Sequence, residues 1–151
     1  MNGKENYLKR LPWFICNRMS MNRWLPSKLL RVRILKWGGV KMGKWCHIGE
    51  NVHFDSISAK QFEFGDNVCI TTGCVLLIHK LDVDERGNKI WSEGKLKIGN
   101  NVYLGCNTVI TRPVTIGDNV IIGAGSVVTK DIPSNCLVVG VPAKIIRRFT
   151  P

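Results

Sequence analysis

The chain of 151 residues is long enough for one domain with a single core and too short for two. Its hydrophobic content of 44% is ordinary, and no apolar run approaches the 18 residues of a transmembrane helix. The net charge of +11 is concentrated in residues 1–45, where 11 Lys and Arg accompany one acid, Glu5. Residues 46–151 carry a balance of only +1, so we expect a nearly neutral body behind a basic N-terminal segment.

The start of the chain lacks the apolar stretch of a secretion signal, so we expect a cytoplasmic protein. The six cysteines form no CxxC pair. We interpret them as small, mostly buried hydrophobic side chains in a reducing compartment, and not as a disulfide or zinc framework. They are Cys16, Cys46, Cys69, Cys74, Cys106 and Cys136.

The basic N-terminal segment mixes aromatic and aliphatic residues with Arg and Lys. Pro12 and Pro26 are expected to start or break helices, and Ser27 to cap a helix over about residues 28–37, before a Gly-Gly pair. One interpretation is a helical cap that covers the open end of the strands that follow. A compatible one is a basic, aromatic-rich surface for an anionic membrane or a lipid-linked substrate. Nucleic acid is disfavoured, because no recognition motif accompanies the charge.

An aliphatic residue, usually followed by a very small one, recurs at every sixth position from residue 98 to 128. The set is Ile98, Leu104, Ile110, Ile116, Ile122 and Val128. The same period occurs at Phe64, Ile70 and Leu76, and more faintly at Ile48 and Phe54. A fixed short period indicates stacked coils. Three hexads make one triangular turn, so we expect full coils over 98–115 and 116–133, most of another over 64–79, and a less regular first one over 48–63.

Within each hexad the aliphatic residue and the one two places earlier, such as Ile122 and Val120, should both point inward. Segments such as Gly117-Asp118-Asn119 separate the strands, and Asn and Gly tolerate the left-handed backbone of a tight corner. We therefore predict an all-β, single-stranded parallel β-helix over residues 46–140, a short helical N-terminal segment, and a tail over 141–151.

The six-residue period is interrupted once. Leu76 predicts a further coil near residue 82, but the period resumes only at Ile98, and residues 80–97 between them are polar. A stacked coil cannot absorb such an insertion inside, so we predict a projecting loop, of the kind that is often functional. His79 lies at its root.

Residues 48–148 resemble the hexapeptide-repeat acyltransferases, especially the sugar O-acetyltransferase branch with the maltose and galactoside acetyltransferases. The most specific segments are 116–133 and 139–147. The resemblance implies a left-handed β-helix, a homotrimer with active sites between neighbouring subunits, and acetyl-CoA as cosubstrate without a metal. The basic N-terminal segment is unlike the usual N-terminal domain of that branch. It is similar to that of small transferases that decorate capsule, lipopolysaccharide or exopolysaccharide sugars.

The resemblance also implies roles for individual residues. His79 is expected to be the catalytic base. The coenzyme-contacting positions are Cys106, Ala124, Thr129, Lys130, Pro142, Lys144 and Arg147. The acceptor is expected near His53, Asp55 and Asp82. Tyr103 replaces a frequent Trp and Arg112-Pro113 a frequent Pro-Gly, departures that leave the coenzyme assignment in place and the acceptor open.

The chemistry agrees with these roles. Acyl transfer needs a hydroxyl or amine to lose its proton as it attacks, and histidine suits that task near neutral pH. Four acids are candidates to orient the imidazole: Asp82, Asp84, Glu85 and Glu93. Small residues around Ala124 allow the close approach of a pantetheine arm, and Lys130, Lys144, Arg147 and Arg148 supply cations for phosphates. Cys106 as a nucleophile is a weaker alternative, because no paired base can be named.

We therefore predict an O-acetyltransferase that acts on a sugar hydroxyl of a surface polysaccharide or its precursor. The alternative within the class is N-acetylation of an amino sugar or nucleotide sugar. A non-catalytic β-helix scaffold and a zinc-dependent carbonic anhydrase-like protein are the alternatives from other classes. Zinc would need His47, His53 and His79 to converge on one ion, and their spacing argues against it.

Overall fold

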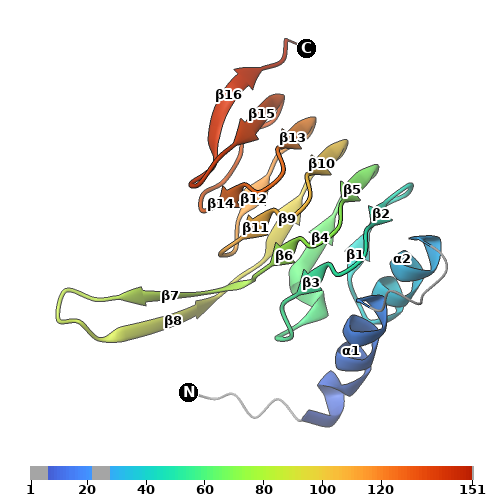
Figure 1. Cartoon of the computed structure of the whole chain (residues 1–151). Helices are drawn as coiled ribbons and strands as arrows, with labels where there is room; N and C mark the ends of the chain where they lie inside the picture. The colour runs from blue at the N-terminus through green and yellow to red at the C-terminus, as the bar shows by residue number, and fades with distance from the viewer. Residues whose placement is uncertain (1–6, 22–27, 151) are drawn as a thin grey trace.

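The protein is a stack of parallel coils with two helices at one end and a projecting hairpin (Figure 1). The computed structural model describes residues 7–21 and 28–150, without the side chains of residues 7–10, 28 and 29. Three parallel sheets, here called walls A, B and C, enclose the core. Each coil contributes one strand to each wall in that order, which makes the body a parallel β-helix.

Wall A consists of β1 (Lys41–Met42), β4 (Phe62–Phe64), β9 (Leu96–Ile98) and β12 (Thr115–Ile116). Wall B consists of β2 (His47–Ile48), β5 (Val68–Ile70), β10 (Val102–Leu104), β13 (Val120–Ile122), β15 (Cys136–Val139) and the antiparallel β16 (Lys144–Arg148). Wall C consists of β3 (His53–Phe54), β6 (Val75–Leu76), β11 (Val109–Ile110) and β14 (Val127–Val128). The short 3-10 helix η1 (Ala59–Gln61) precedes β4.

The repeated aliphatic residues form the core, as predicted. In β10, Val102 and Leu104 are buried while Tyr103 between them is exposed. The register places Leu104 directly between Ile70 and Ile122 of the neighbouring coils, so identical positions stack on one another. Each such fully buried side chain contributes roughly 1.5–3 kcal/mol to folding, which explains why the period is kept so strictly.

The predicted left-handed corners are also confirmed. Asn67, Asn101, Asn119 and Asn135 all have positive φ, between 54° and 60°. Their side-chain amides form a ladder along the stack, with Nδ2–Oδ1 distances of 3.0, 3.1 and 2.9 Å from one coil to the next. Asn therefore suits this corner for two reasons: it tolerates the left-handed backbone conformation, and its side-chain amide links neighbouring coils.

The first coil begins earlier than the sequence suggested. Strand β1 starts at Lys41, inside the segment interpreted as preceding the repeats. Met42-Gly43 continues the six-residue period one step before Ile48-Gly49, but Met is not an aliphatic residue and the match was missed. A Cβ on Gly43 would lie 2.6 Å from the Gly65 carbonyl carbon, so this corner has the same close stacking as the later ones.

The insertion after Leu76 forms an ordered hairpin. Strands β7 (His79–Val83) and β8 (Lys89–Glu93) pair antiparallel and extend away from the stack (Figure 1). Asp84 closes the turn, since its carboxylate accepts bonds from the backbone N–H groups of Arg86 and Asn88 at 2.9 and 2.8 Å. The chain rejoins wall A at Leu96, so the last two residues of the predicted loop belong to the stack.

The two N-terminal helices cover the first coil. Helix α2 (Lys28–Trp37) confirms the helix predicted over about residues 28–37; Pro26 and Ser27 lie outside the described residues. Pro12 neither starts nor breaks helix α1 (Tyr7–Ser20), so that prediction is wrong. As the sixth residue of α1, Pro12 lies near the start of the described helix, where few hydrogen bonds precede it.

Helix α1 is held to the stack by an aromatic contact and a polar one. The Trp13 ring lies 6.2 Å from that of Phe54 and 6.0 Å from that of Phe62, centroid to centroid. The Asn17 side-chain amide donates to the Phe54 carbonyl at 2.9 Å. Within the described part of the chain, neither helix has the length and apolar character needed to cross a membrane.

Candidate active site

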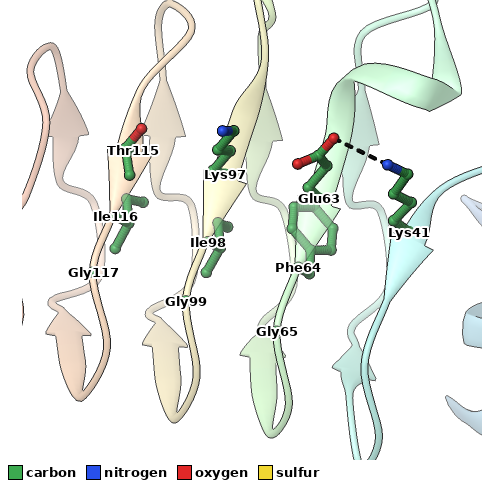
Figure 2. Close-up of a pocket in the computed structure, with 10 residues that line it drawn as sticks. All are labelled: Lys41, Glu63, Phe64, Gly65, Lys97, Ile98, Gly99, Thr115, Ile116 and Gly117. Atoms are coloured by element: carbon green, nitrogen blue, oxygen red, sulfur yellow. Dashed lines mark hydrogen bonds and ion pairs between the residues drawn. The ribbon is translucent and has the colours of Figure 1, made fainter.

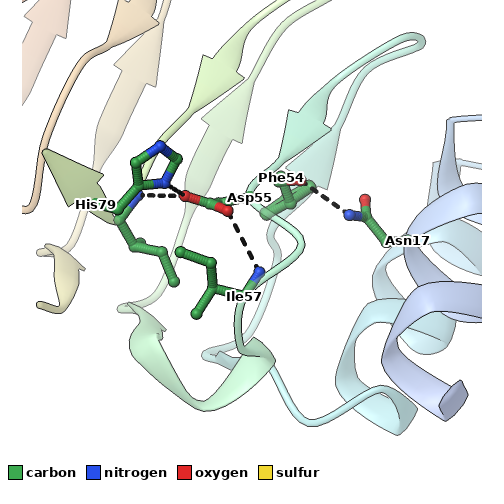
Figure 3. A network of polar contacts seen from close by, with 6 residues as sticks. Asn17, Phe54, Asp55, Ile57 and His79 are labelled. Carbon is green, nitrogen blue, oxygen red and sulfur yellow. Dashed lines mark hydrogen bonds and ion pairs between the residues drawn. The ribbon is translucent and has the colours of Figure 1, made fainter. Parts of the chain in front are cut away.

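The strongest pair of catalytic groups lies at the edge between walls C and A. Asp55 follows β3 directly, and His79 begins the hairpin just after β6, the strand paired with β3. The Asp55 backbone N–H donates to the Leu76 carbonyl at 2.9 Å, which fixes the two coils in this register. The His79 Nδ1 contacts Asp55 Oδ2 directly (Figure 3).

The surroundings of Asp55 determine how the histidine is protonated. Its side chain is only 5% exposed, and its oxygens accept the backbone N–H groups of Ile57 at 3.3 Å and Ile78 at 3.1 Å. An ionised carboxylate can only accept hydrogen bonds. The ring proton of a neutral His79 is therefore assigned to Nδ1, and this N–H donates a hydrogen bond to Asp55. The lone pair of Nε2 is then available at a side chain that is 28% exposed. This is the arrangement of an oriented general base.

The carboxylate that contacts His79 is therefore none of the four acids considered from the sequence for that task. Asp82 forms an ion pair with Lys80, and its pKa is lowered first by that hydrogen bond and also by the charge of Arg112. Asp84 belongs to the hairpin turn. Asp55 was expected at the acceptor instead, and its signal was the replacement of the usual small residue by an acid in the hexad Phe54-Asp55.

Trp91 is a second neighbour of His79 that sequence reasoning missed. It lies on β8, opposite Leu81 in the hairpin, and its ring centroid is 5.3 Å from that of the imidazole with a 40° tilt. The residue is 65% exposed. Its only sequence signal was a lone aromatic residue inside a polar insertion.

The other histidines do not join this pair to form a metal site. His47 lies on wall B, and His53 is exposed on the outer side of wall C, two residues before Asp55. Among the described residues, no three His, Cys, Asp or Glu side chains form a group that could hold a metal ion. The three-histidine zinc alternative thus has no support in the geometry.

Two of the expected coenzyme positions lie at a different edge, between walls B and C. Cys106 and Ala124 occupy this edge on adjacent coils, and the Gly125 N–H donates to the Cys106 carbonyl at 2.8 Å. Both side chains are exposed. A Cβ on Gly105 would lie 2.4 Å from the Ala124 nitrogen, so the backbones of the two coils approach each other closely here. The edge is a smooth strip that a thin, extended molecule could follow.

The remaining coenzyme positions lie at the end of the stack far from the helices. Thr129 and Lys130 follow β14, Pro142 lies in the turn between β15 and β16, and Lys144 and Arg147 lie on β16. The three cations are exposed, and none forms an ion pair within the part of the chain that the structure describes. Exposed, uncompensated cations of this kind suit phosphate groups.

A groove of about 500 Å³ lies elsewhere, on wall A (Figure 2). Glu63 there accepts bonds from Lys41 at 3.4 Å and Lys95 at 2.7 Å, and these bonds lower the pKa of its carboxyl group. None of the residues that line the groove is a predicted site residue. The groove contains no histidine, and the Glu63 carboxylate in it is already engaged by two lysines.

The protein is a coiled-repeat protein: a parallel β-helix with an Asp–His pair at one edge, an exposed strip at another edge and exposed cations at its end. Comparison with known proteins shows which coiled-repeat proteins it resembles. Residues 95–130 match the family model of the bacterial transferase hexapeptide (six repeats). Residues 95–130 are thus hexapeptide repeats, which confirms the predicted resemblance to the hexapeptide-repeat acyltransferases.

Three relatives are informative. The chain is 40% identical over 113 residues to the galactoside O-acetyltransferase of Escherichia coli, a match that covers 71% of this chain and 56% of the relative. A maltose O-acetyltransferase structure from Clostridium difficile has a TM-score of 0.65 at 28% identity, covering 96% of this chain and 88% of that one. A galactoside acetyltransferase structure in complex with coenzyme A has a TM-score of 0.70 at 27% identity, covering 99% and 86%. The chain spans little more than half the length of the curated relatives it matches.

Proposed function

We propose that this protein is an acetyl-CoA-dependent O-acetyltransferase whose acceptor is a sugar hydroxyl. The observation that carries the proposal is the contact between His79 and the buried Asp55, at an edge bordered by the hairpin. The relatives support the donor and the acceptor class, since they include a galactoside O-acetyltransferase and a galactoside acetyltransferase in complex with coenzyme A.

In the proposed reaction, Nε2 of His79 takes the proton of the acceptor hydroxyl as its oxygen attacks the acetyl carbonyl carbon. Acetyl-CoA supplies the activated acetyl group as a thioester. The carboxylate of Asp55 holds the imidazole in the required tautomer and stabilises its charge once the proton has arrived. As the bond from carbon to sulfur breaks, the proton on Nε2 is available to the leaving sulfur, so the base returns to its starting state.

The residues at the edge between walls B and C fit the donor. The strip around Cys106 and Ala124 is exposed, and its coils stack with close backbone contact at Gly105. The phosphates and the adenine end of coenzyme A would be held by the residues at the end of the stack, which are Thr129, Lys130, Pro142, Lys144 and Arg147. The cations among them form no ion pair with any residue that the structure describes, which suits them to bind phosphate.

We propose a left-handed coil and a homotrimer, as the resemblance implies. Geometry supports the trimer, because His79 and the strip with Ala124 lie at opposite edges of wall C within one chain. A closed ring in which each copy turns one edge towards the other edge of its neighbour would bring base and donor together. The active site would then lie between subunits.

We propose that the acceptor is a sugar of a surface polysaccharide or its precursor. His53 on wall C and Asp82 on the hairpin flank the Asp–His pair and are the candidates to contact it. N-acetylation of an amino sugar remains the alternative, since the same base and donor would serve it.

A single product analysis tests the reaction. The protein is incubated with acetyl-CoA and a panel that includes methyl galactoside, maltose and glucosamine, and mass spectrometry locates the acetyl group. We expect an acetate ester on a hydroxyl; an amide on glucosamine would favour the N-acetyl alternative. His79→Ala should abolish transfer while coenzyme A binding is retained. A wild-type protein that transfers nothing and does not bind coenzyme A contradicts the proposal.

We also propose that the protein works in the cytoplasm, in peripheral contact with anionic membrane through helix α1. The side of α1 opposite the stack exposes Leu11, Phe14, Ile15 and Met19 around Arg18. The segment that contains α1 carries nearly all of the net charge. Exposed apolar side chains on a basic helix suit an interface with anionic headgroups.

Vesicle cosedimentation tests the membrane contact. The protein should bind vesicles containing phosphatidylglycerol at low salt and be released at high salt. Phe14→Ser should weaken binding, whereas Ile146→Ser, at an equally exposed position (59%) at the other end of the stack, should not. Absence of binding even at low salt would leave α1 with a covering role only.

A further inference from the structure

Trp91 on the hairpin lies next to His79, although its indole contributes little to the stability of the hairpin. Residues directly opposite in an antiparallel pair point to the same side. The pairs His79–Glu93 and Leu81–Trp91 are adjacent alternate pairs, so imidazole and indole share one side of the hairpin as diagonal neighbours. The ring-centroid distance of 5.3 Å confirms that they touch.

Within a single copy, most of the indole is uncovered. Trp91 is 65% exposed, and Leu81 and Val83 beside it are exposed as well. A two-stranded hairpin gains little stability from a tryptophan that buries so little of its surface. An exposed indole in contact with the proposed base is therefore available to a ligand bound at that base.

The ligand chemistry that fits is a sugar ring. A pyranose has a face of C–H groups and a rim of hydroxyls, so it can lay its apolar face on an indole while a hydroxyl points to the side. Here that hydroxyl would point towards the imidazole. We propose that Trp91 is the platform on which the acceptor sugar stacks, and that it sets which hydroxyl reaches Nε2 of His79. This inference rests on the proposed function, because it assigns the acceptor side of that same site.

The proposal separates the two substrates of the enzyme. The indole holds the acceptor and makes no contribution to coenzyme A, whose expected contacts lie at the edge between walls B and C and on β16. Removing the indole should thus raise the acceptor KM and reduce the choice among hydroxyls. The acetyl-CoA KM should stay unchanged. An aromatic replacement should restore part of what alanine removes, because any flat ring offers some stacking surface.

The experiment compares wild type with Trp91→Ala, Trp91→Phe and a control, Trp45→Ala, at a tryptophan exposed in a corner of the first coil. With maltose and methyl galactoside as acceptors, we expect Trp91→Ala to raise the acceptor KM about tenfold or more. Trp91→Phe should lie between it and wild type, and Trp45→Ala should match wild type. An unchanged acceptor KM in Trp91→Ala overturns the inference, and so does a rise confined to the acetyl-CoA KM.

A binding measurement without turnover keeps this inference distinct from the proposed reaction. Either sugar should quench tryptophan fluorescence in His79→Ala without acetyl-CoA, and the quench should vanish when Trp91→Phe is added. If the wild type transfers no acetyl group but the quench depends on Trp91, the proposed reaction is contradicted and the role of Trp91 in sugar binding is supported. If transfer occurs but neither quench nor KM depends on Trp91, the platform fails alone. Sedimentation must show the same oligomer for all variants; a change in Trp91→Ala would assign the indole to a subunit contact and overturn the platform.

Discussion

At the scale of single residues, Asp55 carries a task that its burial makes possible. Its carboxylate accepts two backbone N–H groups and contacts Nδ1, so it cannot turn away from the histidine without losing three partners. This rigidity fixes both the ring orientation and the tautomer of His79. A base with free Nε2 needs both, since a rotated or tautomerised ring would present a donor to the acceptor hydroxyl.

Asp55→Asn should therefore lower kcat by about 10²–10⁴-fold while the affinity for coenzyme A stays the same. The asparagine amide can donate to Nδ1, which would leave the proton on Nε2 and disable the base. Steady-state kinetics and calorimetric coenzyme A titration measure the two effects. Asp82→Asn, at the proposed acceptor contact on the hairpin, is the comparison variant: we expect its effect on the acceptor KM and a much smaller change in kcat. Equal losses in both variants would contradict the role given to Asp55.

The cysteines offer a residue-scale test of the donor strip. Cys106 is exposed beside Ala124, whereas Cys74 is buried and its pKa is raised by that burial. A thiol reagent should modify Cys106 much faster than Cys74, because thiolate and access are both required. Saturating coenzyme A should protect Cys106, as peptide mass spectrometry would show. Unprotected Cys106 under saturation would place the donor elsewhere.

At the scale of elements, helix α1 has two different faces. On one face Trp13, Cys16, Asn17 and Ser20 are buried, and Trp13 and Asn17 contact the stack. The apolar residues of the opposite face are exposed. Trp13→Ala should lower the free energy of unfolding by about 3–5 kcal/mol, since it removes a buried ring packed on two others. Phe14→Ser, on the outer side, should change it by less than about 0.5 kcal/mol. Urea denaturation followed by circular dichroism measures both; similar losses would mean that both faces are covered.

The hairpin depends on its turn in a way that pH should reveal. The pKa of Asp84 is lowered, mostly by its hydrogen bonds with the side chain and backbone of Asn88. A lowered folded-state pKa means that the carboxylate supports the turn at neutral pH, and that this support is lost as pH falls through the lowered value. The protection of the hairpin amides against hydrogen exchange, relative to their intrinsic exchange rate at each pH, should fall in that acidic range. Asp84→Ala should exchange fast at neutral pH too, and a hairpin equally protected in this variant would contradict the assignment.

Elements were predictable from sequence to the extent that their signals were local. The six-residue period identified the coils from Ile48 onwards, and the glycine pair marked the end of α2 at Trp37. The Asp55–His79 contact joins two adjacent coils. Which side chains meet there depends on how the strands of the two coils are aligned, and the six-residue period does not specify that alignment. Trp91 contacts His79 only because the insertion folds as a hairpin. The sequence predicted a loop there, and a loop does not specify which residues of the insertion lie opposite each other.

At the scale of the whole molecule, the proposed catalytic pair and the proposed coenzyme strip lie at two different edges of the β-helix. The Asp–His pair lies where walls C and A meet, and the strip with Cys106 and Ala124 lies where walls B and C meet. Wall C separates them in every coil. A single copy would therefore hold its base and its proposed donor on different sides, and a functional site requires either a second copy or a donor that crosses the wall.

Subunit complementation decides between these two possibilities. His79→Ala removes the base, and Ala124→Trp blocks the strip at an exposed position without disturbing the core. Each variant alone should be inactive. The two are coexpressed with different tags, and mixed oligomers are isolated by both tags in turn. In a closed ring of three copies with sites between neighbours, each mixed trimer keeps one intact site, so we expect about a third of the wild-type rate. Mixed trimers without activity would place base and donor in the same copy, and a monomer in sedimentation would contradict the shared site.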